Sequence, residues 1–437
     1  MSLTSLRAPG GCAALPRAAL RPGRATCWWL FAGLLALVGS MPPEAMFLLV
    51  LVALALRVTE LEFTVVLPPA RLWAGPVACL ALGTLHLGNA PARDVARDVW
   101  LLSGSVFLAF YGWILIRRPA DLRAMLRAFV FGATAWSLLY LARAAQSLDL
   151  LAAGRDGFRQ AAGAGSLLPV VALFALLGSC AFDVVPAVRG RFLAWTCGVV
   201  CALALAVSMS RTWWGAGAIL AAAGLLVRLG FARLLWASVF LGATLGVLGA
   251  VGGPSALTVR GLRELTALAS MEMLSAENQV TQPDLNRFWR SYEAYRGLQA
   301  VQNGTMVQAW VGRGLGARLD LGLYQLLDGE YRRHIPVLHN GFLFVALKAG
   351  LAGLLAYGAW ILCLVRDGWR ASKLGSAEAQ LVGALVVGLA LVLVETSLAV
   401  GGAFNFQACF ALFIVLGAAA RWTILVRRER SLQSEAC

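Results

Sequence analysis

The chain of 437 residues is 60% hydrophobic and only 14% charged, and its mean hydropathy is +0.75. Its apolar residues fall in repeated blocks of roughly 15 to 25 residues, a pattern that fits membrane-spanning helices and excludes the weak alternation of a membrane β-barrel. The net charge of +15 does not indicate nucleic acid as a partner, because no nucleic-acid-binding module is recognisable. We therefore expect an all-α polytopic membrane protein in contact with anionic membrane lipids.

About twelve apolar segments follow one another along the chain, nine before a long polar stretch and three after it. The first two are short and are separated only by Met41, Pro42 and Pro43, so they form either two crossings or one re-entrant hairpin. The predicted spans are 27–40, 44–56, 72–87, 100–116, 128–142, 167–184, 192–209, 213–227, 234–249, 342–365, 381–397 and 404–420.

The basic residues predict the orientation, because short loops rich in arginine and lysine stay in the cytoplasm. Alternate connections carry most of them, although Arg93, Arg97 and Arg143 fall on the other side. The predicted division is a cytoplasmic basic tail (1–26), transmembrane helices 1–9 (27–253), an external loop domain (254–338), transmembrane helices 10–12 (339–420) and a cytoplasmic tail (421–437). Polar side chains are expensive inside a bilayer, so the long external insertion is where we expect the chemistry.

His339 is the strongest candidate for a catalytic base. It lies between Leu338 and Asn340, where a strongly apolar span begins on the predicted external face. An imidazole has an ordinary pKa of ~6.5, which suits it to take a proton from a hydroxyl near neutral pH. The alternative is that His339 merely caps the helix together with Asn340.

Arg211 is the second unusual residue, in a very short connection between two spans. An arginine so close to the bilayer is costly unless it is paired, hydrated or extended to the interface. One interpretation is therefore simple snorkelling. The other is a fixed cation that binds phosphate through two parallel hydrogen bonds.

Two helices are predicted inside the loop, over 259–275 and 284–302. The second contains Arg287 and Arg290 on one face, so that two guanidinium groups can converge on one anion, along with aromatic side chains. A solvated helix of mixed charge is the alternative. His334, which follows Arg332 and Arg333, either binds an anion or lies on a solvated surface.

Gly312, Gly314 and Gly316 superficially resemble a phosphate-binding turn. The strand-to-helix context and a Walker lysine are missing, so we predict a tight turn beside the membrane and no nucleotide cofactor. The sequence also lacks an Asp-x-Asp pair, and we predict neither a metal nor another cofactor.

The order of these features resembles the O-antigen ligases. The shared pattern consists of a Ser-Arg pair after a span, an arginine-rich loop helix with aromatic residues, a Gly-x-Gly-x-Gly turn, and His-Asn at the start of the next span. In this chain the residues are Ser210 and Arg211; 287–296; Gly312, Gly314 and Gly316; His339 and Asn340. The similarity covers about the second half of the chain and the general layout of spans, which resembles a GT-C type of membrane glycosyltransferase.

The resemblance implies a multi-pass enzyme of the bacterial inner membrane with its active site facing the periplasm. Such an enzyme transfers an O-antigen glycan from undecaprenyl diphosphate to a hydroxyl of lipid A-core. The carried-over roles are His339 as general base, Arg211 with Arg290 or Arg287 as diphosphate-binding residues, and Trp289, Tyr295 and Asn340 as substrate-binding residues. Direct attack on the anomeric carbon would invert its configuration.

Other classes remain open. O-antigen polymerases and protein O-oligosaccharyltransferases share the carrier-linked donor and differ in the acceptor. A peptidoglycan glycosyltransferase would need an essential acid, for which Asp284 is the best candidate in the loop. A secondary transporter would need a polar pathway, and Glu395 in a late span is the most visible acidic residue for it.

Overall fold

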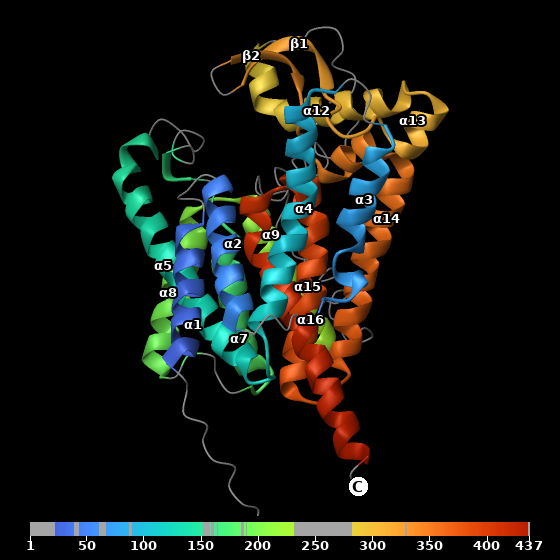
Figure 1. Ribbon diagram of the computed structural model, residues 1–437. Coiled ribbons are helices and arrows are strands. Elements are labelled where there is room, and N and C mark those ends of the chain that lie inside the picture. Colours follow the sequence, from blue (N-terminus) through green and yellow to red (C-terminus); the bar gives the residue numbers. More distant parts are fainter. Residues whose placement is uncertain are drawn as a thin grey trace, which may run out of the picture.

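The computed structural model describes residues 22–38, 43–60, 67–86, 90–151, 158, 161–163, 165–184, 188, 190–230, 282–327 and 330–435. Helices dominate this part of the chain and run roughly parallel to one axis (Figure 1). The bundle helices are α1 (Pro22–Leu37), α2 (Pro43–Glu60), α3 (Ala74–Thr84), α4 (Ala92–Leu115), α5 (Asp121–Gln146), α7 (Leu168–Ala181), α8 (Arg191–Val207), α9 (Arg211–Leu229), α14 (Gly341–Ser372), α15 (Ala377–Ala399) and α16 (Phe406–Glu435), and the short 3₁₀ segments are η1 (Ala70–Leu72), η2 (Leu148–Leu151) and η4 (Gly402–Phe404).

The helices confirm a predominantly helical chain whose long apolar helices are compatible with a membrane protein. Within the described residues, 6 helices (α4, α5, α9, α14, α15 and α16) are long and apolar enough to cross a bilayer. Shorter apolar helices coincide with the predicted spans at 27–40, 44–56, 72–87, 167–184 and 192–209. The predicted span 234–249 and loop helix 259–275 lie outside the described residues. The total number of crossings stays a prediction.

Several helices extend beyond the apolar segments that predicted them. Helix α4 begins at Ala92, well before the predicted start at residue 100, and its polar first turns contact the loop domain. Helix α16 continues to Glu435 through the segment predicted as a tail. The reason is that apolar composition marks only the part of a helix that lies in hydrocarbon, whereas backbone hydrogen bonding carries the helix onward into polar surroundings.

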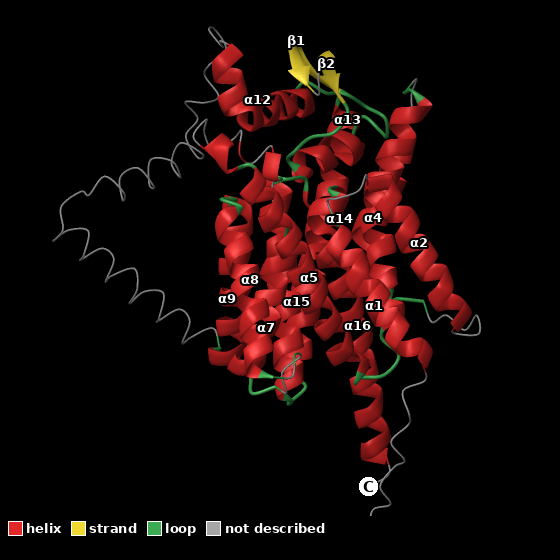
Figure 2. Cartoon of the chain, turned by 90° about the vertical axis from the view of Figure 1, so that its left-hand side faces the viewer, coloured by secondary structure: helices red, strands yellow, loops and turns green. Residues whose placement is uncertain are grey.

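Basic residues gather at one end of the bundle, which we call the basic end. It contains the α4–α5 and α14–α15 connections and the end of α16, opposite α12 and the two strands (Figures 1 and 2). Two ion pairs tie helices together there: Arg71 to Asp367 at 3.0 Å and Arg123 to Glu378 at 2.8 Å. The opposite end, which carries the residues 282–340, is the loop end.

Small residues let the bundle helices approach closely. A Cβ on Gly112 of α4 would collide with the backbone of Ile414 in α16, and one on Gly388 of α15 would lie 2.6 Å from the Leu220 side chain of α9. Close contacts at glycine are typical of helix packing in membranes, where van der Waals contact replaces the hydrophobic driving force.

The loop domain contains a long helix, a short helix and a β-hairpin. Helix α12 spans Gln282–Gln302 and α13 spans Met306–Val311, while β1 (Leu319–Leu327) pairs antiparallel with β2 (Glu330–Ile335). The predicted helix at 284–302 is thus confirmed with a slightly earlier start, whereas the sequence analysis did not predict the hairpin. The Tyr292 hydroxyl of α12 donates to the Leu321 carbonyl at 2.5 Å, which fixes the helix against β1.

The loop domain is hydrogen-bonded to α14 at a point where this helix is interrupted. Gly350 has φ 66° and ψ −164°, which interrupts the helix and frees carbonyl groups before it. Arg313 N donates to Leu347 O at 2.8 Å, and Gly314 N donates to Lys348 O at 3.2 Å. The glycine-rich segment is therefore a tight turn against the membrane helices, as predicted, and the backbone N–H groups of Arg313 and Gly314 bind backbone carbonyls of α14.

Buried charged side chains also stabilise the contact between the loop domain and α14. Lys348 of α14 and Asp98 of α4 have side chains only 1% and 0% exposed, and Lys348 Nζ lies 2.6 Å from Asp98 Oδ2. The same carboxylate oxygen accepts from Gly316 N at 2.7 Å, while Lys348 also donates to the Ala317 carbonyl. Arg318 pairs with Asp94 at 2.5 Å. The turn at 312–318 is thus joined to both helices by charge-assisted hydrogen bonds.

We predict that Lys348→Met destabilises the protein by about 3–5 kcal/mol. It removes the closest cation from the buried Asp98 carboxylate and leaves, among the described residues, only Arg97, whose Nε lies 3.9 Å from Asp98 Oδ1. The measurement is thermal unfolding of the purified protein in detergent. Lys373→Met, at an exposed position after α14, is the matched control and should change the midpoint little. The double variant Lys348→Met/Asp98→Asn should recover part of the loss. Equal midpoints for the wild type and Lys348→Met would contradict this account.

Candidate active site

The candidate site lies where the loop domain meets the start of α14. Asn340 is the N-cap of α14, and its side chain accepts a hydrogen bond from Leu343 N at 3.0 Å. Gly341 packs closely on the backbone of Gly401, just before η4. Helix α12 crosses above, and Gly297 allows it to approach, since a Cβ there would lie 3.1 Å from the Leu338 side chain. The segment around His339 is therefore fixed from two sides.

A buried carboxylate holds His339. Glu293 of α12 places Oε2 2.7 Å from His339 Nδ1, and its Oε1 accepts a hydrogen bond from the His339 backbone N–H. The Glu293 side chain is 1% exposed, whereas the His339 side chain is 49% exposed. The Nδ1 edge of the imidazole is thus held by a buried carboxylate, while about half of the side chain is exposed to solvent.

The hydrogen-bond partners assign the tautomer of a neutral His339. An ionised carboxylate only accepts hydrogen bonds, so Nδ1 carries the proton that it donates to Glu293. Nε2 then presents a lone pair to the exposed side. This is the arrangement of a general base whose ring is oriented by an acidic partner.

His339 was singled out as a candidate from the sequence, whereas its partner Glu293 was not. The two residues are 46 positions apart, so no local spacing connects them. The signal that was present is modest: Glu293 is an acidic residue in the middle of a helix whose other marked residues are arginines and aromatics. Only the crossing of α12 over the start of α14 brings the pair together.

The other predicted residues of α12 have different surroundings. Arg290 is exposed, and Trp289 is partly buried against the apolar core. The Tyr295 hydroxyl accepts a hydrogen bond from Gln299 Nε2 at 2.5 Å. Arg287 belongs to the helix, but its side chain lies outside the described residues. The structure thus leaves Arg290 accessible on the helix that supplies Glu293.

Arg211 lies at the same end of the bundle. It is an exposed residue at the start of α9, directly after the buried N-cap Ser210. One turn further, Gly215 faces Glu395 of α15, whose Oε1 would lie 3.2 Å from a Cβ at that position. Gly401 lies in the connection between α15 and η4, and its backbone packs on Gly341. Arg211 and His339 therefore come from different helices that share one end of the bundle.

The arginines of β2 form ion pairs within the hairpin. Arg333 forms two hydrogen bonds to Asp320 of β1, at 2.9 and 3.1 Å, and Arg332 pairs with Glu330 at 2.9 Å. The hydrogen bonds from Arg333, followed by that from Gly322 N, hold the pKa of Asp320 well below its usual range. His334 is exposed. These arginines support the strands, and Arg290 on α12 and Arg211 at the start of α9 stay the candidate anion-binding residues because both are exposed.

Within the described ranges, no group of three or more His, Cys, Asp or Glu side chains comes together to hold a metal ion. Cys197 and Cys201 are buried in α8, and the Ser137 hydroxyl of α5 donates to Cys201 Sγ at 3.8 Å. Their surroundings are those of ordinary helix packing.

Comparison with known proteins adds no assignment: no protein-family model matches the chain, and a search of the curated proteins found no match.

We predict that Asp320→Asn loosens the hairpin, because Arg333 loses a charged acceptor. The rate of chymotryptic cleavage after the exposed Tyr324 and Tyr331 should rise at neutral pH. Since the folded-state pKa of Asp320 is lowered, the pair is complete above the ordinary carboxyl pKa and is lost only as the pH falls through the lowered value. Glu330→Gln is the matched control, because its carboxylate pairs within one strand. Equal cleavage of the wild type and Asp320→Asn would overturn this prediction.

Proposed function

We propose that the protein is a membrane glycosyltransferase of the O-antigen ligase type, with about twelve spans in a GT-C-like arrangement. In this proposal it transfers a glycan from undecaprenyl diphosphate to a hydroxyl of lipid A-core, on the periplasmic face of the bacterial inner membrane. The observation that carries the proposal is the pairing of half-exposed His339 with buried Glu293 at the head of an apolar helix bundle.

The pair fits the proton transfer that glycan transfer needs. As the acceptor oxygen forms its bond to the anomeric carbon, its proton moves to His339 Nε2 and the bond from that carbon to the diphosphate oxygen breaks. Glu293 keeps Nδ1 protonated and stabilises the imidazolium that forms. Attack from the face opposite the leaving group inverts the anomeric configuration.

Arginine supplies the positive charge for the leaving group. The diphosphate gains charge as the glycosidic bond breaks, and guanidinium groups stabilise that charge through paired hydrogen bonds. Arg211 and Arg290 are exposed at the loop end, and Arg287 lies one turn from Arg290 on α12. Tyr295 and Trp289 are the aromatic candidates for contact with a sugar.

The loop end also carries features that suit lipid-borne substrates. Helix α13 exposes Met306 by 78%, Val307 by 56% and Trp310 by 48%, so it can rest on the lipid surface beside α14. Cytoplasmic retention of the basic end would place this surface on the outer leaflet. The identity of the acceptor rests on the resemblance alone, and O-antigen polymerases or protein O-oligosaccharyltransferases would use the same donor chemistry.

We predict that His339→Ala lowers the rate of glycan transfer by about 100-fold or more, because the acceptor hydroxyl loses its base. Arg211→Ala should also cause a large loss. The assay is transfer from purified undecaprenyl-diphosphate-linked glycan to lipid A-core in liposomes, without ATP. His334→Ala, which removes an exposed histidine from the same domain, should retain full activity. If His339→Ala transfers glycan as fast as the wild type, the proposed base is wrong. If the wild type transfers glycan only to growing glycan or to protein, the acceptor assignment is wrong and the donor chemistry stands.

We also predict that transfer continues in excess chelator, because arginines rather than a divalent ion stabilise the leaving group. The measurement compares rates with and without EDTA, followed by addition of Mg²⁺. Complete loss in chelator with recovery on adding the ion would contradict this arrangement.

A further inference from the structure

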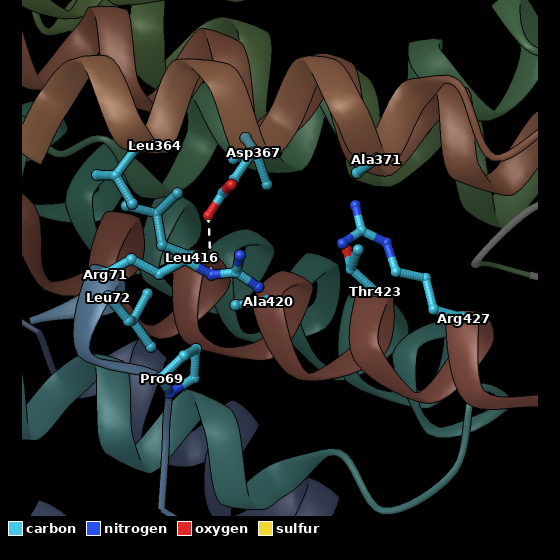
Figure 3. Close-up of a pocket in the computed structure, with 11 residues that line it drawn as sticks. Pro69, Arg71, Leu72, Leu364, Asp367, Ala371, Leu416, Ala420, Thr423 and Arg427 are labelled. Atoms are coloured by element: carbon cyan, nitrogen blue, oxygen red, sulfur yellow. Dashed lines mark ion pairs between the residues drawn. The ribbon is translucent and has the colours of Figure 1, made fainter.

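A second polar site lies at the basic end, far along the bundle from His339. A small cleft, partly open to solvent, lies between η1, α14 and α16. Arg71 comes from η1, Asp367 from α14, and Thr423 and Arg427 from α16 (Figure 3). None of these residues takes part in the proposed transfer reaction.

The charges in the cleft do not balance. Arg71 Nε lies 3.0 Å from Asp367 Oδ2, so these two side chains neutralise each other. Arg427 extends into the cleft toward Ala371 and Thr423 (Figure 3), and no ion pair or hydrogen bond within the described part of the chain engages its side chain. The Thr423 hydroxyl donates to the Ala419 carbonyl at 2.8 Å, which leaves its oxygen able to accept. One partly buried guanidinium is therefore available for an anion.

The remaining walls are apolar. Leu72, Leu364, Leu416 and Val386 line the cleft beside the arginines, and each of them is buried or nearly so. A guanidinium at the mouth of an apolar cleft between helices matches a molecule with an anionic head and a hydrocarbon chain. A free anion would make no use of the leucine walls.

We propose that this cleft binds the phosphate headgroup of an anionic membrane lipid, with Arg427 as the main contact and the leucines against the start of an acyl chain. Desolvation in the cleft strengthens a charge-assisted hydrogen bond, so the bound lipid would also link η1, α14 and α16 at this end. The proposal is independent of the transfer reaction at the loop end.

The test is native mass spectrometry of the full-length protein in detergent, titrated separately with phosphatidylglycerol, phosphatidylcholine and inorganic phosphate. Phosphatidylglycerol should be retained, and Arg427→Gln should weaken its binding by about tenfold or more, because a charged hydrogen-bond donor is lost. Arg428→Gln removes the same charge from the adjacent exposed position and should bind like the wild type. Ala420→Phe, which fills the cleft without changing charge, should reduce binding as Arg427→Gln does.

Equal weakening by Arg427→Gln and Arg428→Gln would show general surface attraction and overturn the site. Unchanged binding by both Arg427→Gln and Ala420→Phe would overturn it as well. If inorganic phosphate prevents retention of phosphatidylglycerol at equal concentration, the cleft binds a free anion and the lipid assignment is wrong. Thermal unfolding of each variant establishes that it is folded.

Discussion

The contact between residues 312–318 and the interrupted part of α14 is the interaction that positions the loop domain on the bundle. The freed carbonyls of Leu347 and Lys348 accept backbone donors, and the buried Lys348–Asp98 pair completes the contact. Burying two charges is favourable only when both are well paired, so this junction is a strict geometric constraint. Together with the direct packing of Gly297 on Leu338, it sets the position of α12 over the start of α14, where Glu293 meets His339.

The His339–Glu293 pair depends on that geometry, and it orients the imidazole so that it can accept a proton. The carboxylate is buried and acts on both the backbone N–H and the ring Nδ1 of one residue, so it fixes the main chain and the side chain together. The half-exposed ring lies at the end of the bundle that also carries Arg211. The proposed glycan transfer uses these features in one reaction, while the proposed lipid site around Arg427 lies at the opposite end of the bundle.

Apolar blocks were sufficient to predict the bundle, because bilayer thickness imposes both length and composition on each helix. They failed at helix ends such as Ala92 and Glu435, where hydrocarbon no longer dictates composition. His339 could be singled out as a candidate from its place at the start of an apolar span. Glu293 and the hairpin were not, because both depend on contacts between distant segments. The Lys348 side chain offered an unused signal, since a lysine within an apolar span needs a buried partner.

The most direct test of the central claim is a double-mutant cycle on the rate of glycan transfer, with His339→Ala, Glu293→Ala and the combined variant. If Glu293 acts through His339, its removal should reduce the rate in the wild-type background and have almost no further effect once His339 is alanine. Independent, multiplicative losses in the combined variant would contradict the account, because the two residues would then serve the reaction separately.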